Sequence, residues 1–69
     1  MLEVAPISDT WMSYAEALMY CAFCTHNEHR DWQMATHDEW VESNEISGWF
    51  VDYEMHQFGV WNVTPVRDI

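Results

Sequence analysis

The side chains best suited to bind a metal or to react lie between positions 21 and 29, where two cysteines and two histidines occur close together. Thiolate and imidazole groups are the ligands that zinc prefers in proteins, so one hypothesis is a small zinc module built from Cys21, Cys24, His26 and His29. Structural zinc sites usually take their ligands from two separated elements, whereas these four would have to wrap a metal within one short stretch. We therefore favour another interpretation. Cys21 is a buried thiol on a helix, Cys24, His26 and His29 are ordinary residues at the end of that helix, and no metal or other cofactor is bound.

A second group of reactive side chains consists of carboxylates. Glu28 and Asp31 are followed by Asp38 and Glu39, and neighbouring carboxylates can exchange protons with a substrate. Asp38 and Glu39, however, suit the positive N-terminal end of a helix, and neither a nucleophile nor a glycine-rich phosphate loop accompanies them. The sequence thus predicts a protein that binds and is not an enzyme.

The charge balance limits what could be bound. Twelve Asp and Glu residues face two Arg and no Lys, which gives a net charge of −10 with neutral His. Contacts with nucleic-acid phosphates need clustered basic residues, and anionic membranes attract them too, so neither class of partner is expected. A basic partner protein fits better. Two alternatives remain: the charge serves solubility alone, or the protein imitates nucleic acid and inhibits an enzyme that binds it.

A helix must position the cysteines. Residues 13–16, Ser-Tyr-Ala-Glu, have the form of a capping box, in which the first and fourth residues satisfy each other's backbone N–H groups. Apolar residues then follow at helical spacing on one face: Tyr14, Ala17, Leu18 and Cys21. We predict a helix from Ser13 to Cys24.

A second capping box, Thr-His-Asp-Glu at 36–39, predicts a short helix that continues through Trp40 and Val41 towards Ser43. Before it, the alternation of Trp32 and Met34 indicates a short extended segment. At the start of the chain, the segment Val4–Ile7 contains Pro6 and is therefore expected to be an edge strand or an extended arm.

The last third of the chain predicts a β-hairpin. Trp49–Glu54 alternates with period two, Met55–Gly59 is a plausible turn, and Val60–Val66 forms the second strand. Trp49 and Trp61 should then pack against each other across the strands. Pro65 also suggests an edge position. Together the elements predict one α+β domain, residues 1–69, with a small antiparallel sheet and two short flanking helices.

Three segments, in order, resemble the motifs of the Lcl C-terminal domain family. Residues 13–21 (SYAEALMYC) resemble its helix that starts Thr-Trp-x-Glu-Ala and ends Tyr-Cys. Residues 30–40 (RDWQMATHDEW) resemble its Asp-Trp-Arg-Leu-Pro-Thr motif, and residues 63–68 (VTPVRD) resemble its terminal Val-x-Pro-Val-Arg.

This resemblance implies a minimal C-type-lectin-like domain, related to the formylglycine-generating-enzyme fold, with adjacent termini and a binding function. It also suggests a short version of phage origin. The chain departs from the pattern where Gln33-Met34-Ala35 replaces Arg-Leu-Pro, and the family's middle strand is missing. The triplet Trp61-Asn62-Val63 lacks the carboxylate of the calcium-dependent sugar site of C-type lectins, and a calcium ion needs six to eight oxygen ligands.

We therefore predict a protein-binding accessory module that acts on a host or virion protein. Its expected contact residues are one aromatic and four acidic side chains: Trp11, Glu28, Asp31, Asp52 and Glu54. The start of the chain resembles no targeting signal, which predicts the cytoplasm, or the virion for a phage protein. Because the missing strand would leave an edge of the hairpin unpaired, a homodimer is also expected.

Overall fold

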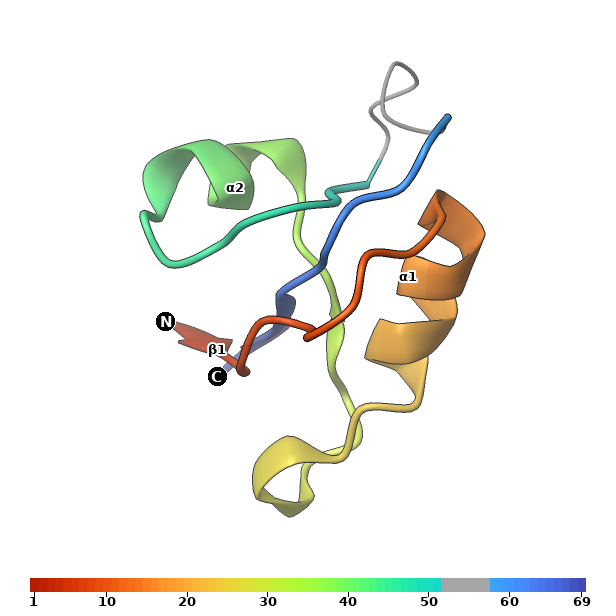
Figure 1. Ribbon diagram of the computed structural model, residues 1–69. Helices are drawn as coiled ribbons and strands as arrows, with labels where there is room; N and C mark the ends of the chain where they lie inside the picture. The colour runs from red at the N-terminus through yellow and green to blue at the C-terminus, as the bar shows by residue number, and fades with distance from the viewer. Residues whose placement is uncertain (52–57) are drawn as a thin grey trace.

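The computed structural model describes residues 1–51 and 58–69. In this part of the chain, two α-helices and a short 3-10 helix surround a three-stranded antiparallel sheet (Figure 1). This arrangement confirms the α+β class. In chain order the elements are β1 (Leu2–Val4), α1 (Tyr14–Ala22), η1 (His26–Glu28), β2 (Gln33–Met34), α2 (His37–Glu42) and β3 (Pro65–Asp68).

Both helices begin where the capping boxes predict. The Ser13 hydroxyl accepts a hydrogen bond from the Glu16 N–H at 3.2 Å, and the Glu16 carboxylate accepts one from the Ser13 N–H at 3.0 Å. Thr36 and Glu39 form the same reciprocal pair at 3.2 and 2.8 Å. Two backbone donors are thus satisfied at each helix start, where no earlier helical turn can accept them. Helix α1 ends two residues before the predicted limit at Cys24.

The last strand of the chain is the central strand of the sheet. The strand order is β1-β3-β2, and Val66 of β3 lies opposite Val4 on one side and Gln33 on the other. The prediction that Pro65 occupies an edge is therefore wrong. Pro65 is the first residue of β3, a position where the missing N–H is tolerated. The edge strand β1 is Leu2–Val4, so only Val4 of the segment predicted as an edge strand or an extended arm, Val4–Ile7, is in a strand.

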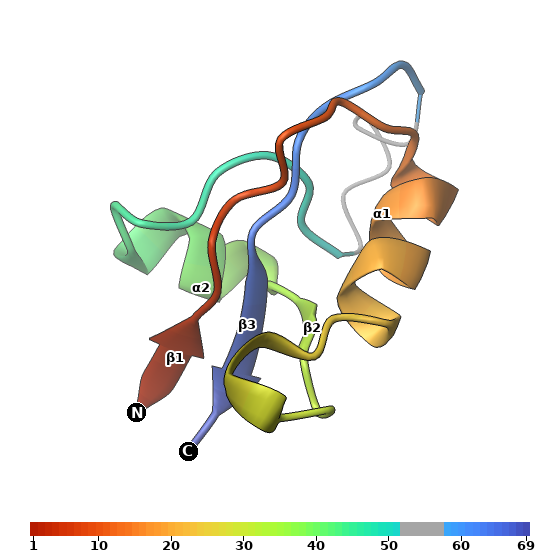
Figure 2. The same cartoon turned by 60° about the horizontal axis from the view of Figure 1, so that its bottom comes forward.

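The N-terminal segment continues beside the C-terminal segment beyond the sheet itself. The red and blue parts of the chain run next to each other in both views (Figures 1 and 2). Met12 and Trp61 exchange two backbone hydrogen bonds of 2.8 and 2.9 Å, and the Ser8 N–H donates to the Val63 carbonyl at 2.9 Å. On one side, the neighbour of residues 61–68 is thus the start of the chain.

The predicted hairpin is accordingly wrong in the described residues. Residues 49–51 form no strand, only residues 65 and 66 of the predicted strand Val60–Val66 are in β3, and residues 52–57 lie outside the described part. The Trp49 N–H donates to the Asn62 carbonyl at 2.8 Å, and β2 pairs with residues 65 and 66, so the segment from 61 to 66 has neighbours on both sides. The open edge on which the homodimer prediction rested is therefore absent between positions 61 and 66, while the oligomeric state itself stays a prediction.

Trp49 lies at the centre of the core. Its ring is 1% exposed, and its Nε1–H donates to the Met12 carbonyl at 2.8 Å. The predicted contact with Trp61 is confirmed, with the ring centroids 5.9 Å apart in an edge-to-face arrangement. The other buried residues of this cluster are mostly small or flexible: Met12, Ala17, Cys21, Met34 and Val63.

Gly48 allows the chain to enter this core. Its φ of +82° lies in the left-handed region, and a Cβ atom there would stand 1.8 Å from the carbonyl oxygen of Asn62. Only glycine combines this backbone conformation with such a close approach.

Candidate protein interface

Helix α1 is apolar on two opposite sides. Ala17 and Cys21 face the core and are 0% and 1% exposed. On the other side, Met19, Tyr20 and Phe23 are 59%, 40% and 75% exposed. An amphipathic surface helix normally presents polar residues to solvent, so this outer face lacks the usual composition. It is a candidate contact surface.

Trp11 extends this apolar face beyond the start of the helix. Its side chain is 63% exposed and borders two adjoining hollows. The first hollow, about 340 Å³ in volume, runs along the outer face of α1, and we call it the α1 groove. The second, about 230 Å³, lies on the side of Trp11 towards Trp61. The α1 groove is lined by Thr10, Trp11, Met12, Glu16, Met19, Tyr20 and Phe23, and the second hollow by Trp11, Trp49, Phe58, Val60 and Trp61.

The charges near the groove are negative. Glu16 lines it, and the bond from Ser13 at the helix cap holds the pKa of that carboxyl below its ordinary value, so Glu16 stays ionised. Tyr20 is affected in the opposite direction: partial burial first, and then the nearby Cys24 and Asp9, raise the pKa of its phenol. Tyr20 therefore remains a neutral hydrogen-bonding group beside a carboxylate.

A separate acidic hollow lies between β1 and α2. It has a volume of about 370 Å³, and its other lining residues are Met1, Leu2, Val4 and Ser43. Its walls carry four carboxylates: Glu39, Glu42, Glu45 and Asp68. Part of the net negative charge of the chain is thus concentrated in this one hollow.

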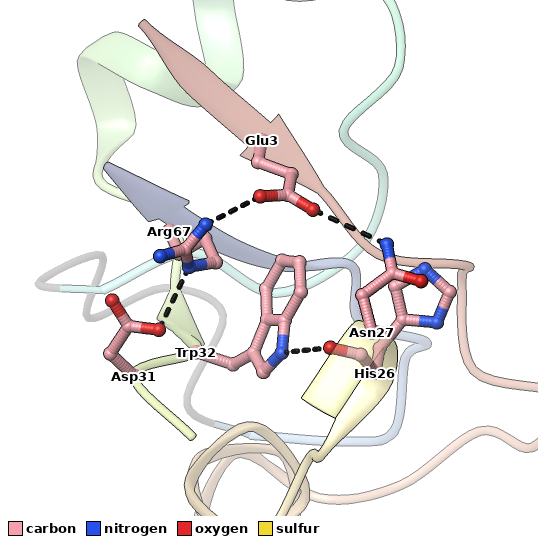
Figure 3. Close-up of polar contacts among 6 residues, drawn as sticks. All are labelled: Glu3, His26, Asn27, Asp31, Trp32 and Arg67. Atoms are coloured by element: carbon pink, nitrogen blue, oxygen red, sulfur yellow. Dashed lines mark hydrogen bonds and ion pairs between the residues drawn. The ribbon is translucent and has the colours of Figure 1, made fainter. Parts of the chain in front are cut away.

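Arg67 of β3 is paired with Glu3 of β1 and with Asp31, which lies between η1 and β2 (Figure 3). Its Nη1 lies 2.6 Å from a Glu3 oxygen, and its Nε lies 2.8 Å from an Asp31 oxygen. The guanidinium also lies 6.0 Å from the centroid of the buried Trp32 ring. Hydrogen bonds from Arg67 lower the pKa of both carboxyl groups below their ordinary values.

The same cluster ties η1 to the sheet. The Trp32 Nε1–H donates to the His26 carbonyl at 3.0 Å, and the Asn27 amide donates to Glu3 at 3.4 Å (Figure 3). Because one of the two arginines of the chain is committed to these contacts, its charge is neutralised within the protein. We assign this cluster a structural role.

The structure separates the residues predicted to form a contact surface. Trp11 precedes α1 and borders the groove, whereas Glu28 and Asp31 follow the other end of that helix. Both are exposed, and Asp31 is paired with Arg67. Asp52 and Glu54 lie outside the described residues.

Sequence reasoning missed the outer face of α1. The signal was present, because Met19, Tyr20 and Phe23 recur at helical spacing on the side away from the predicted core stripe. One apolar side of such a helix packs on the core of its own domain. The other side stays exposed to water unless another protein surface covers it.

The zinc alternative finds no assembled site in the described residues, where no three His, Cys, Asp or Glu side chains are grouped to hold a metal ion. Cys21 is buried, as predicted from its place on the helix, and burial raises the pKa of its thiol to about 12. His26 and His29 lie beside the Trp32 ring, with centroids 5.7 and 6.5 Å from it.

Comparison of the chain with protein-family models, curated proteins and solved structures found no match. In the part of the chain that the structure describes, no helix has the length and apolar character needed to cross a membrane.

Proposed function

We propose that this protein is a non-enzymatic binding module that holds a protein partner in the α1 groove. The observation that supports this most strongly is the exposed outer face of α1. Trp11, Met19 and Phe23 are each more than half exposed and line one groove. Clustered exposed apolar side chains mark interaction sites, and aromatic residues are the side chains most often found at the centre of such sites.

The negative charge would assist the encounter with a basic partner. A chain with a net charge of −10 attracts an oppositely charged protein over a distance of about 10 Å at moderate salt. Such steering raises association rates, whereas the apolar contacts slow dissociation. In this proposal the acidic surface speeds association, and the groove provides the contacts that hold the partner.

We further propose that the domain is a minimal C-type-lectin-like fold, as the motif resemblance suggests. Two features support this: the helices α1 and α2 begin within the resembling segments, and the two termini are adjacent. The Ile69 N–H donates to the Met1 carbonyl at 2.8 Å. A cytoplasmic location belongs to the same proposal and is supported by the two cysteines, which are both free thiols.

The test is partner capture that depends on the groove. A bacterial lysate, the material that a phage origin suggests, is passed over the immobilised wild-type protein, a Trp11→Ala/Phe23→Ser variant, and Val41→Ser. Val41 is a matched control because it is 61% exposed but lies on α2.

The proposal expects a protein that the wild type and Val41→Ser retain, that the groove variant loses, and that binds again when purified. Equal retention of every captured protein by the groove variant and the wild type would refute it.

A further inference from the structure

We propose that the segment held by the α1 groove is an amphipathic helix with an apolar face and flanking lysine or arginine residues. This inference rests on the proposed binding function and specifies its partner. It follows from the shape of the groove, from the side chains that line it and from the charges beside it.

The lining of the groove favours a helix as occupant. Glu16, Met19 and Tyr20 of α1 are spaced i, i+3 and i+4, and the C-cap residue Phe23 follows at i+7. Together they form a ridge on the helix surface. Ridges of one helix pack into the grooves of another, and a helical ligand offers apolar anchors with the same spacing. Strand addition is disfavoured here, because it needs an open sheet edge and the groove is lined by none of the three strands.

The dimensions agree with a short helix. Nine residues of α1 extend for about 13 Å, and Trp11 prolongs the apolar surface into the second hollow. A ligand helix of about three turns would cover this length. Met19 is unbranched and adaptable, while Trp11 and Phe23 provide rigid aromatic surfaces.

The charges beside the groove favour a partner segment with positive charge. Glu16 lines the groove and Asp9 acts on Tyr20, whereas none of the lining residues is Lys or Arg. Of the two arginines, Arg67 is paired with Glu3 and Asp31, and Arg30 follows η1 beyond the other end of α1.

A second copy of the chain would bring another net charge of −10 to this surface. A helix with flanking Lys or Arg residues instead meets Asp9 and Glu16 with opposite charge. The cationic helix is therefore favoured over self-association.

The experiment uses the full chain and three synthetic peptides of about 14 residues, long enough for about four helical turns. The first is a Leu/Lys amphipathic helix, the second carries Glu in place of Lys, and the third carries Ser in place of Leu. Binding is measured by titration calorimetry, and the site is located from the changes in backbone amide NMR signals.

We expect the Leu/Lys peptide to bind at least about tenfold more tightly than either comparison peptide. Its signals should change at residues 10–23 and 58–61, and added salt should weaken binding. Trp11→Ala/Phe23→Ser should lose about tenfold in affinity while Val41→Ser loses none. Circular dichroism confirms that each variant is folded, which is expected because all three side chains are exposed.

Several results would overturn the inference. If the Leu/Glu peptide binds as tightly as the Leu/Lys peptide, the argument from charge is wrong. If the Ser/Lys peptide binds as tightly, the argument from apolar contacts in the groove is wrong. A dimer in sedimentation equilibrium that Phe23→Ser abolishes would assign the groove to a second copy. If a natural partner depends on the groove but the Leu/Lys peptide does not bind there, this inference fails and the proposed function stands. If the peptide binds there but no natural partner depends on the groove, the proposed function fails.

Discussion

Replacement of Gly48 by alanine should be among the most damaging single changes in this domain. The new Cβ would lie 1.8 Å from the Asn62 carbonyl oxygen and 2.4 Å from its carbon. Those are backbone atoms, which cannot rotate aside as the tip of a side chain can. To reach ordinary contact at 3.4 Å, the carbonyl oxygen would have to withdraw by 3.4 − 1.8 = 1.6 Å.

The cost has two parts. A non-glycine residue in the left-handed region costs about 1–2 kcal/mol. Withdrawal of the Asn62 carbonyl also breaks its 2.8 Å hydrogen bond with the Trp49 N–H and leaves that donor buried, which costs about 1–3 kcal/mol more. The sum, about 2–5 kcal/mol, compares with a total stability of about 3–10 kcal/mol for 69 residues.

Gly59 is the matched control. Its φ is +93°, and among residues 1–51 and 58–69, its two chain neighbours aside, nothing lies within 4 Å of the Cβ that alanine would add. Gly59→Ala should therefore cost only the backbone part, about 1–2 kcal/mol. Urea unfolding followed by tryptophan fluorescence measures both variants. Equal losses of unfolding free energy at the two glycines would refute the argument from the Asn62 contact.

Three further predictions concern the helix caps, the arginine cluster and the thiols. Ser13→Ala and Thr36→Ala should each lower the unfolding free energy by about 0.5–2 kcal/mol in urea titrations, and no loss at either would contradict the caps. Arg67→Gln should lower the Tm more at pH 7 than at pH 3. Its two carboxylate partners have lowered folded pKa values, so their stabilisation is present above the ordinary values of 4.5 and 3.8 and is lost on acidification. Finally, iodoacetamide at pH 8 should label Cys24 and leave Cys21 unmodified in mass spectra until urea is added, because burial raises the pKa of Cys21 to about 12; equal labelling of both in the folded protein would count against this.

Local signals predicted the helices correctly. A capping box involves residues only three positions apart. The helix starts at Ser13 and Thr36 can therefore be predicted from the local sequence alone. The burial of Cys21 followed from helical periodicity in the same way.

The sheet could not be predicted from such signals, because its partners come from opposite ends of the chain. Leu2 lies opposite Asp68, and no local pattern specifies that pairing. The period-two pattern at 49–54 was also misleading, since the consecutive residues Trp49 and Phe50 are 1% and 2% exposed. A strand with one solvent face would have placed one of them outside.

For the candidate site, only Trp11 was predicted. Reasoning about charge selected exposed carboxylates, and it gave no weight to Met19 and Phe23, which resemble core residues in sequence. Whether a helical apolar residue is buried depends on which elements cover it, and that is a tertiary property.

The position of β3 has a consequence for how the domain is made. The middle strand of the sheet is the last to be synthesised, so β1 and β2 have no strand partner until residues 65–68 exist. The N-terminal segment also lacks its backbone hydrogen-bond partners until then, because Ser8 and Met12 pair with Val63 and Trp61. The helices can form early on the ribosome, whereas the sheet closes in a late step that joins the two ends of the chain. Such distant contacts slow folding, so newly made protein should expose its apolar N-terminal residues to chaperones for longer than a helical domain of equal size.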